Sequence, residues 1–435
     1  MFKVEVLDIY LHGDLIGQLF RFDNGTTTPI IRFVADEKLA SGHHRWVVSQ
    51  SMIAKNIQQQ EAHWRDRASE RLNGKEGRLP VFFQNMLPEG IFRSHIAEMR
   101  ACREDDHFSL FAACGLDLPG AVKALPASLT RRELANLVTQ ENDPLEMSVT
   151  ADPLPLGVSI SGMQPKLGLI EEGGRYVARR RLGVTRIIGK MAQSDRPKLP
   201  EVEHLSLQLA EVAGVSVCEH QLVPITKLGI EHGYAMQGSE NFLAVKRFDR
   251  DGSVRIQCED FAQALNVDPR NKYQGATYAG MAALMMRYPD SMGSDAVHAL
   301  LRQVAINDLM GNFDAHLKNF CLIYPDGTTP ILSKAFDIVA WSVYWGGHGS
   351  ALKLYRSSER TKAALLSPST IREFCARVGI AEKPCISVVK EAVSRAYAFW
   401  PNLIEQSSML DIQKERLLKR LVTHRFYTKS ANSLN

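Results

Sequence analysis

The pattern of the sequence changes near residue 258. Before that point, segments such as "KVEVLDIYLHG" at the start of the chain alternate apolar and polar residues between glycine turns, which is typical of β-strands. After it, helical periodicity dominates and one β-hairpin interrupts it, over 320–339. The pattern predicts an α+β fold in which a β-rich first half precedes an all-helical lobe. We expect helices in this lobe at 259–266, about 275–288, 293–311, about 368–379 and 383–424.

A proline-rich segment at 142–157 is typical of a linker and divides the first half. Upstream of it, a polar stretch at 56–73 predicts a helix. Downstream, "KLGLIEEGGRYVARR" predicts a hairpin that turns at Gly173-Gly174. We therefore expect three parts, namely an N-terminal β-rich domain over 1–127, a second β-rich lobe over 128–257 and the helical lobe over 258–435.

The composition excludes several classes of protein. Of the 435 residues, 45% are hydrophobic and 23% are charged, which is ordinary for a globular protein. No apolar run approaches the roughly 18 residues of a membrane span, and the N-terminus lacks the segments of a signal peptide. The seven cysteines are scattered without a CxxC pair. This argues against a disulfide framework and a zinc ribbon, and favours reduced thiols in the cytoplasm.

The charge of the chain is only slightly basic, with a formal net charge of +4. The basic residues gather in two short clusters, at 175–183 and 413–425. We interpret both clusters as solvated faces, because a dedicated nucleic-acid binder usually has a stronger local stripe. Such patches can still assist DNA contact within a larger complex.

The most informative polar stretch is "AINDLMGNFDAHLKNFCLIYPDGTTPILSKAFDIV", at 305–339. A helix ends near Gly311, a polar loop carries Asp314 and Asn319, and the hairpin then delivers Asp337 between two apolar residues. Phosphoryl transfer needs this order of parts, because one aspartate activates the attacking hydroxyl while an asparagine and a second aspartate hold Mg²⁺. The Asp-x-x-x-x-Asn spacing alone equally fits an Asx-rich turn. The flanking elements, and a carboxylate that is costly to bury without a partner, favour catalysis.

Two loops contain further candidate residues. His316 can approach a phosphate or simply hydrogen-bond its own loop, and both interpretations stay open. Lys318, in the same loop, is another catalytic candidate. Upstream, the small residues of "SISGMQPK" place Ser161 and Gly162 in a loop whose backbone N–H groups can approach phosphates.

A kinase also needs a strand lysine, a helical glutamate and a hinge between its lobes. Lys190, at the end of "TRIIGK", can be the lysine, and Glu203 can be its partner. Glu203 can equally be a solvated carboxylate in the first turn of its helix, where the helix dipole favours negative charge. "VKRFDR" at 245–250 lies where the two halves meet, as a hinge beside adenine would.

With these residues in hand, the chain resembles the HipA family of serine/threonine-kinase toxins from bacterial toxin–antitoxin modules. "LPVFFQNMLPEGIFR" and "DDHFSLFAACGLDLPGAV" are similar to the N-terminal domain signature of the family. "SISGMQPKL", "VKRFDR", "CEDFAQALNV" and "GNFDAHLKNF…FDIV" are similar to its successive kinase-core motifs. The resemblance covers most of the chain and implies a two-lobed protein-kinase-like fold that uses ATP and Mg²⁺.

The resemblance also implies roles by position. Asp314 is similar to the catalytic aspartate of the family, and Asn319 and Asp337 match its Mg²⁺ ligands. Arg247-Phe248 matches the backbone hinge beside adenine.

For the opening loop, the resemblance implies that Ser159 becomes autophosphorylated and that Ser161 can be as well. Phosphorylation adds about two negative charges at neutral pH, which would compete with the nucleotide phosphates and eject the loop. The targets of the family are aminoacyl-tRNA synthetases. Its usual partner is a HipB-like helix-turn-helix antitoxin, and the pair binds operator DNA to repress its own operon.

Two positions depart from the family pattern. Gly189 separates Lys190 from the preceding apolar pair, and a one-residue slip turns a side chain to the other face of a sheet. On this ground Lys190 is expected to need a β-bulge. Cys258 stands where glutamine is usual, and we interpret it as a small buried residue. The Gly189 position supports an alternative, an impaired kinase that acts as an antitoxin-binding co-repressor, and a small-molecule kinase is a further alternative.

Overall fold

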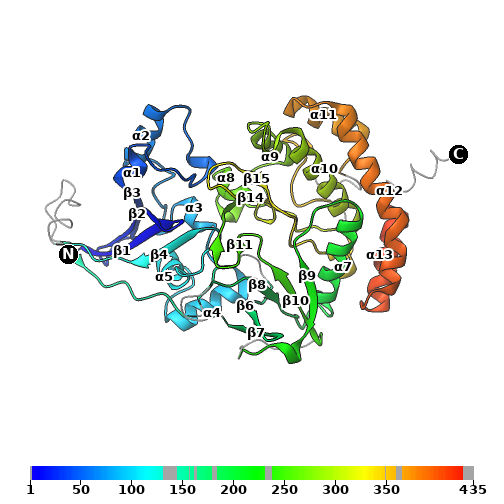
Figure 1. Ribbon diagram of the computed structural model, residues 1–435, viewed down its shortest axis with the longest axis horizontal. Coiled ribbons are helices and arrows are strands. Elements are labelled where there is room, and N and C mark those ends of the chain that lie inside the picture. Colours follow the sequence, from blue (N-terminus) through cyan, green and yellow to red (C-terminus); the bar gives the residue numbers. More distant parts are fainter. Residues whose placement is uncertain are drawn as a thin grey trace.

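The computed structural model describes residues 2–130, 145–155, 157–160, 164–178, 184–230, 238–347, 349–358 and 365–424. Figure 1 shows an N-terminal sheet with its short helices at one side, a second sheet in the middle and the long helices at the other side. The fold is thus mixed α and β, with the helices concentrated in the second half of the chain, as predicted. Among the described helices, none combines the length and the apolar character needed to cross a membrane.

The N-terminal sheet is formed mainly by an antiparallel meander. Its strands lie in the order β3-β2-β1-β4, and β5 pairs parallel to β1. Five helices connect β3 to β4 and supply much of the local core. The strands are β1 Phe2–Leu11, β2 Asp14–Asp23, β3 Ile30–Ala35, β4 Val122–Pro126 and β5 Leu145–Met147. The helices are α1 Glu37–Ala40, α2 Ile57–Arg65, α3 Val81–Gln84, α4 Gly90–Arg100 and α5 His107–Ala113.

The helix predicted over 56–73 is shorter than expected and ends at Arg65. The carboxylate of Asp66 accepts a hydrogen bond from the backbone N–H of Ala68, and the hydroxyl of Ser69 accepts one from Arg71. Short polar side chains that bond to the nearby backbone compete with helical hydrogen bonds, so the polar pattern continues beyond the end of the helix.

The second sheet is antiparallel, with the order β7-β6-β8-β10-β9. The predicted turn is confirmed, because Gly173 and Gly174 join β6 to β7 with φ of 58° and 75°, a two-residue turn that favours glycine. One helix, α7, packs against the sheet. The elements are β6 Lys166–Glu172, β7 Arg175–Ala178, β8 Ile187–Lys190, α7 Leu199–Val212, β9 His220–Pro224 and β10 Asn241–Lys246.

The helical lobe contains the predicted hairpin, which β13 extends to a small three-stranded sheet. β11 and β12 form a hairpin just before it. The strands are β11 Arg250–Asp251, β12 Val254–Arg255, β13 Gln257–Asp260, β14 Cys321–Tyr324 and β15 Ile331–Leu332. The helices are α8 Phe261–Ala264, α9 Tyr278–Met285, α10 Gly293–Met310, α11 Pro368–Val378, α12 Glu382–Gln406 and α13 Asp411–Thr423.

The helix predicted over 383–424 is two helices, with a break at 407–410. Ser407 has an extended backbone, and its hydroxyl donates to the carbonyl of Ile404. The backbone N–H of Leu410 donates to the side chain of Gln413, which caps the next helix. These local bonds replace the helical ones, and α13 turns back along α12 (Figure 1).

Candidate active site

Lys190 lies at the centre of a buried ionic cluster. Its ammonium group forms ion pairs with Glu203 on α7 and with Asp337, beyond the hairpin. Burial opposes the charge of Lys190, but the carboxylates of Asp337 and Glu203 outweigh it and raise the pKa of this lysine. A strand lysine and a helical glutamate therefore meet, as the sequence predicted.

The prediction of a β-bulge at Gly189 is wrong. β8 pairs in continuous register with β10 and β6 through Gly189 to Lys190. Gly189 faces the opposite side of the sheet, where a Cβ would come within 2.6 Å of Leu169 and 3.4 Å of Phe242. A Cβ here would displace the end of the Leu169 side chain, so glycine suits this crowded face. The regular strand turns Lys190 toward Glu203.

A second lysine, Lys166, stands directly opposite Lys190 on β6. Like charges in this position repel each other, and the carboxylates of Glu203 and Asp337 offset the repulsion. Lys166 is almost fully buried, and burial lowers its pKa while the charge of Asp337 works in the other direction. Sequence reasoning gave Lys166 no role of its own; the signal that could have found it is the pairing register of the two strands.

The loop after α10 positions Asp314. Gly311 ends the helix with a φ of 77°, and a Cβ there would come within 2.6 Å of Ser342. The hydroxyl of Tyr273 donates a hydrogen bond to the carboxylate of Asp314. The side-chain nitrogen of Asn319 donates to the carbonyl of Asp314 over 2.8 Å. Both ends of the Asp314 residue are thereby held in place.

Asp337 adopts the left-handed conformation, with a φ of 56°, which aspartate tolerates better than most residues. Burial alone would favour its neutral form, but Lys166 and Lys190 outweigh it and lower the pKa of Asp337. The carboxylate is therefore ionised. Its side chain keeps 20% of its surface exposed, toward the cavity described next.

A cavity of about 250 Å³ joins the two halves of the site. Asp314 and Asp337, which the sequence assigned to one site, line it together with His316, for which the sequence left two interpretations open. The remaining lining residues are Gln164, Lys166, Arg196, Lys272, Tyr273, Phe313, Val339, Trp341 and Trp345.

His316 is buried beside Asp314. Its Nε2 atom lies 3.8 Å from the Asp314 carboxylate, and its ring meets Tyr273 edge-on at 4.9 Å. Burial, together with the charge of Lys272, lowers the pKa of His316 to about 3. The imidazole is therefore neutral at physiological pH, and its Nδ1 atom has no hydrogen-bond partner among the described residues.

Lys318 binds Glu89 instead of lining the cavity. Its ammonium group lies 2.5 Å from one oxygen of Glu89, and Lys272 lies 2.9 Å from the other. Glu89 immediately precedes α4, so the N-terminal domain contributes a partly buried carboxylate to the base of this loop. Burial opposes its charge, but the two lysines hold the pKa of Glu89 well below its usual range. In the sequence, Glu89 is recognisable only as part of the motif "LPVFFQNMLPEGIFR", which does not indicate this role.

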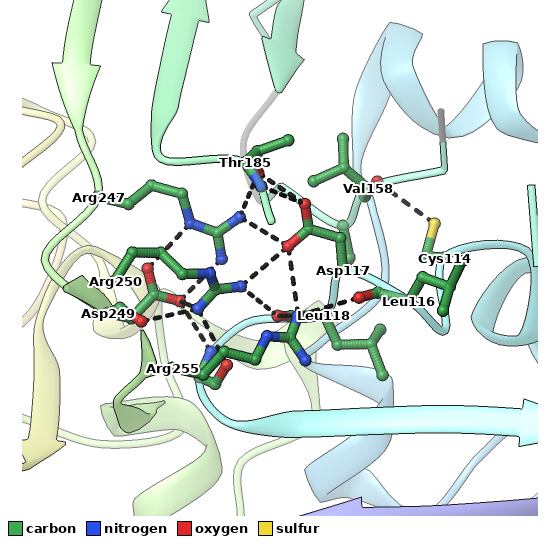
Figure 2. A network of polar contacts seen from close by, with 12 residues as sticks. Cys114, Leu116, Asp117, Leu118, Val158, Thr185, Arg247, Asp249, Arg250 and Arg255 are labelled. Carbon is green, nitrogen blue, oxygen red and sulfur yellow. Dashed lines mark hydrogen bonds and ion pairs between the residues drawn. The ribbon is translucent and has the colours of Figure 1, made fainter. Parts of the chain in front are cut away.

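The side chain of Arg247 belongs to a different network, shown in Figure 2. It lies 3.2 Å from Asp117 of the N-terminal domain and 2.8 Å from Asp249. Phe248 packs on Phe336, the residue before Asp337, with ring centres 5.2 Å apart. A hinge role of Arg247-Phe248 thus rests on the backbone alone, since the Arg247 side chain is used to hold two domains together.

Ser159 is buried in the N-terminal domain. Its hydroxyl donates to the carbonyl of Met86, and its flanking residues Val158 and Ile160 belong to the N-terminal hydrophobic core. Ser161 and Gly162, the other predicted loop residues, lie outside the described residues.

The residues present fit a magnesium nucleotide. In the part of the chain that the structure describes, no group of three or more His, Cys, Asp or Glu residues is arranged to hold a metal. Magnesium bound through phosphates needs only one or two protein oxygens, which Asn319 and Asp337 can provide. The unpartnered Nδ1 of His316 and the two buried lysines suit an anionic ligand in the cavity.

A strand lysine paired with a helical glutamate, set against a catalytic-type loop in a helical lobe, defines a two-lobed protein-kinase-like protein. The chain belongs to the HipA family, because the family model for the HipA-like C-terminal domain matches residues 158–400 and that for the HipA N-terminal domain matches residues 7–125.

Sequence and structure similarity to known proteins supports the assignment to this family. The chain is 29% identical to the kinase-named protein Y4dM of Sinorhizobium fredii, over 92% of each chain. It is 25% identical to the serine/threonine-protein kinase toxin HipA of Shewanella oneidensis, over 62% of this chain and 65% of that protein. The fold matches a solved complex of the Shewanella oneidensis HipA, HipB and operator DNA with a TM-score of 0.67, at 20% identity, over 99% of this chain and 100% of that one.

Proposed function

We propose that this chain is an ATP-dependent serine/threonine protein kinase that acts as the toxin of a toxin–antitoxin system. The observation that carries the proposal is the contact of Lys190 with both Glu203 and Asp337, beside the cavity that Asp314 lines. Protein kinases position the nucleotide phosphates and Mg²⁺ with a lysine, a glutamate and an aspartate of this kind. The kinase names of two relatives support the proposal.

MgATP, when bound in the cavity, supplies the phosphoryl group that is transferred. Lys166 and Lys190 would hold its phosphates, and Asn319 and Asp337 would hold its Mg²⁺. The lysines are already oriented by carboxylates in the buried cluster, so little reorganisation is needed when the phosphates arrive.

Asp314 acts as the general base in this proposal. Burial raises its pKa, and the hydrogen bond from Tyr273 partly offsets that rise. The carboxylate is therefore a stronger base than a solvated aspartate, yet it is held in one orientation for the proton of the acceptor hydroxyl. The neutral His316 lies beside it and adds a polar group without adding charge.

We propose that the kinase inactivates itself by phosphorylating Ser159, Ser161 or both. Ser159 is buried, so its modification requires residues 157–160 to leave the N-terminal core. A phosphate carries about two negative charges and is costly to return to an apolar site. Modification would therefore hold the segment outside and disrupt the phosphate-binding loop that follows it.

The cellular roles rest on the family. We propose a translation factor such as an aminoacyl-tRNA synthetase as the substrate, by resemblance alone. We propose a HipB-like antitoxin as the partner, with operator DNA bound through it, by analogy with the complex that the fold matches. All seven cysteines lie among the described residues and none is in a disulfide, which suits a reducing compartment such as the cytoplasm.

The alternative, a catalytically impaired subunit that acts mainly as a transcriptional co-repressor, loses its one supporting feature. It rested on the displacement of Lys190 by Gly189. The regular pairing of β8 and the two carboxylate contacts of Lys190 argue against it.

The test is to incubate the purified full-length protein with Mg²⁺ and ATP, and to measure its intact mass and map its peptides. We expect a gain of one or two phosphate groups on the peptide that contains Ser159 and Ser161, and no gain in the Asp314→Ala variant. Asp105→Ala, at an exposed site in the N-terminal domain, is the matched control and should behave as wild type. No phosphate gain by the wild-type protein would contradict the proposal.

A further inference from the structure

A second hollow, of about 350 Å³, adjoins the catalytic cavity. Arg196 and Trp345 line both spaces. Three segments form the second hollow, namely the loop 195–197 after β8, the chain 343–345 that follows Asp337, and residues 410–416 at the start of α13. We refer to this hollow as the α13 groove.

The α13 groove exposes large apolar side chains to solvent. Trp345, Leu410 and Ile412 are 44%, 39% and 51% exposed, and all three line the groove. Single exposed apolar residues are ordinary, but a cluster of them rimmed by polar groups marks an interaction site.

The floor of the groove is already rigid. The carbonyl of Pro197 accepts hydrogen bonds from Tyr344 over 3.0 Å and from Gln413 over 2.9 Å. Arg416 donates to the carbonyl of Val343 over 2.8 Å. These bonds tie the three segments together, so a ligand would not have to order them on binding.

The charges of the groove favour an acidic ligand. The guanidinium of Arg196 lies over Trp341 and Trp345, at 5.2 and 5.6 Å from the ring centres, and these two rings stack on each other at 5.2 Å. Arg416 is a second cation. Asp195, the one acidic residue among those that line the groove, lies 3.7 Å from Arg196, so the lining keeps an excess of one positive charge. Tryptophan and arginine are the residue types that most often dominate the energy of protein interfaces.

We propose that the α13 groove docks the segment of a protein substrate that flanks the acceptor hydroxyl, and that this segment carries a large apolar side chain and acidic residues. This inference rests on the proposed kinase function. The chain from Asp337 to Trp345 forms a wall of both spaces, so a segment held in the groove leads directly to Asp314. Arg196 and Trp345 are binding residues here, and they take no part in the phosphoryl transfer.

The first experiment measures docking without catalysis. Full-length protein with Asp314→Asn is titrated into fluorescein-labelled 15-residue peptides that have a central serine, and fluorescence anisotropy is recorded. Two peptides carry a leucine and two glutamates, one before the serine and the other after it. For each of them, one matched peptide has alanine in place of the leucine, and another has lysines in place of the glutamates. We expect one of the leucine–glutamate peptides to bind about tenfold more tightly than its matched versions.

Groove variants in the same background identify the contacts. Ile412→Glu and Trp345→Ala should remove the preference for peptides with leucine over those with alanine. Arg196→Glu should remove or reverse the preference for peptides with glutamate over those with lysine. Ile57→Glu and Arg103→Glu, at exposed sites in the N-terminal domain, are matched controls and should change neither preference. Equal binding of all peptides, or a preference that survives the groove variants, would overturn the proposal.

The second experiment asks whether docking serves the active site. Wild-type protein with Mg²⁺ and ATP should phosphorylate the preferred peptide with a kcat/KM about tenfold above the matched peptides, mainly through KM. Ile412→Glu should abolish this advantage and leave autophosphorylation unchanged. A peptide that binds the groove without being phosphorylated preferentially would identify the groove as a partner site and refute the substrate role. If autophosphorylation fails as well, the proposed kinase function is what has failed.

Discussion

Two buried charge clusters in this protein are built in different ways. The interface cluster joins the N-terminal domain to the rest of the chain, and each of its side chains is less than one-tenth exposed. It consists of Asp117, Asp249, Arg247, Arg250 and Arg255 (Figure 2). The cleft cluster pairs two lysines with two carboxylates and opens onto the catalytic cavity. It consists of Lys166, Lys190, Glu203 and Asp337.

The choice of cation explains the difference. Arginine presents several donors in a fixed plane and stays charged, so it can satisfy a carboxylate and backbone carbonyls at once. Arg250 does so, with Asp117 at 2.9 Å and the carbonyls of Gly120 and Leu118 at 3.0 and 2.9 Å. Burial opposes the charge of Asp117, but the three arginines lower its pKa to about 2. Lysine is a compact point charge, and in the cleft cluster Lys190 is paired with two carboxylate side chains, those of Glu203 and Asp337.

The largest expected effect is that of Asp337→Asn on catalysis. Asparagine also tolerates the left-handed backbone, so the protein should still fold. Lys166 and Lys190 lose one counter-charge, and we expect the unfolding free energy to fall by about 1–2 kcal/mol, less than for a fully enclosed carboxylate because Asp337 borders the cavity. Loss of the carboxylate that faces the proposed Mg²⁺ should reduce autophosphorylation by about a thousandfold or more. Radiolabel incorporation and urea denaturation measure the two quantities. If the Asp337→Asn variant stayed active, the cleft cluster would have no catalytic role that distinguishes it from the interface cluster.

Asp117→Asn should produce the opposite result. It leaves three buried arginines with less compensating charge, which we expect to lower the unfolding free energy by about 3 kcal/mol. Autophosphorylation per folded molecule should be unchanged at low temperature, since Asp117 does not line the cavity. Asp105→Asn, at an exposed aspartate, is the control and should leave stability unchanged. A stable Asp117→Asn protein with impaired catalysis would show that the interface cluster is functional.

Glu89→Gln tests a carboxylate that links the N-terminal domain to the catalytic loop. Lys318 and Lys272 would lose their shared counter-charge, and the loop that carries Asp314 should shift. We expect kcat to fall about tenfold to a hundredfold, with KM for ATP unchanged because the contacts of Lys190 are intact. Glu98→Gln, at an exposed position of α4, is the control and should leave kcat unchanged. A change confined to KM for ATP would refute this positioning role.

The smallest effect is expected from Tyr273→Phe. Burial raises the pKa of Asp314 and the Tyr273 hydroxyl opposes that rise, so its removal should raise the pKa further. Because the base must be ionised to act, the acid limb of the pH profile of kcat/KM should move to higher pH. At pH values above this limb, kcat/KM should fall by less than about threefold. Tyr10→Phe, whose hydroxyl contacts an aspartate outside the site, is the control. An unmoved acid limb would mean that Tyr273 does not tune Asp314.

The sequence predicted the parts of the site that are close along the chain. Asp314 and Asn319 are five residues apart, and the bond that joins them forms within one loop. It did not predict Glu89, which meets Lys318 across 229 residues of sequence. The interpretation of Gly189 failed for a related reason. Leu169 and Phe242, two of the three side chains nearest to this glycine, come from neighbouring strands, and a single strand read in isolation does not reveal them.

By itself, the sequence determined the order of the elements, the glycine turn at 173–174 and the motifs of the family, because backbone geometry and hydrophobic periodicity act over a few residues. The tertiary structure alone decided most of the other partners of the buried charges. It added Asp337 to the predicted Lys190–Glu203 pair, and it assigned Lys318 to Glu89 and Arg247 to the interface cluster. A buried ion requires a counter-charge or hydrogen bonds wherever the fold brings them within reach, and in this protein many of those groups come from distant segments of the chain.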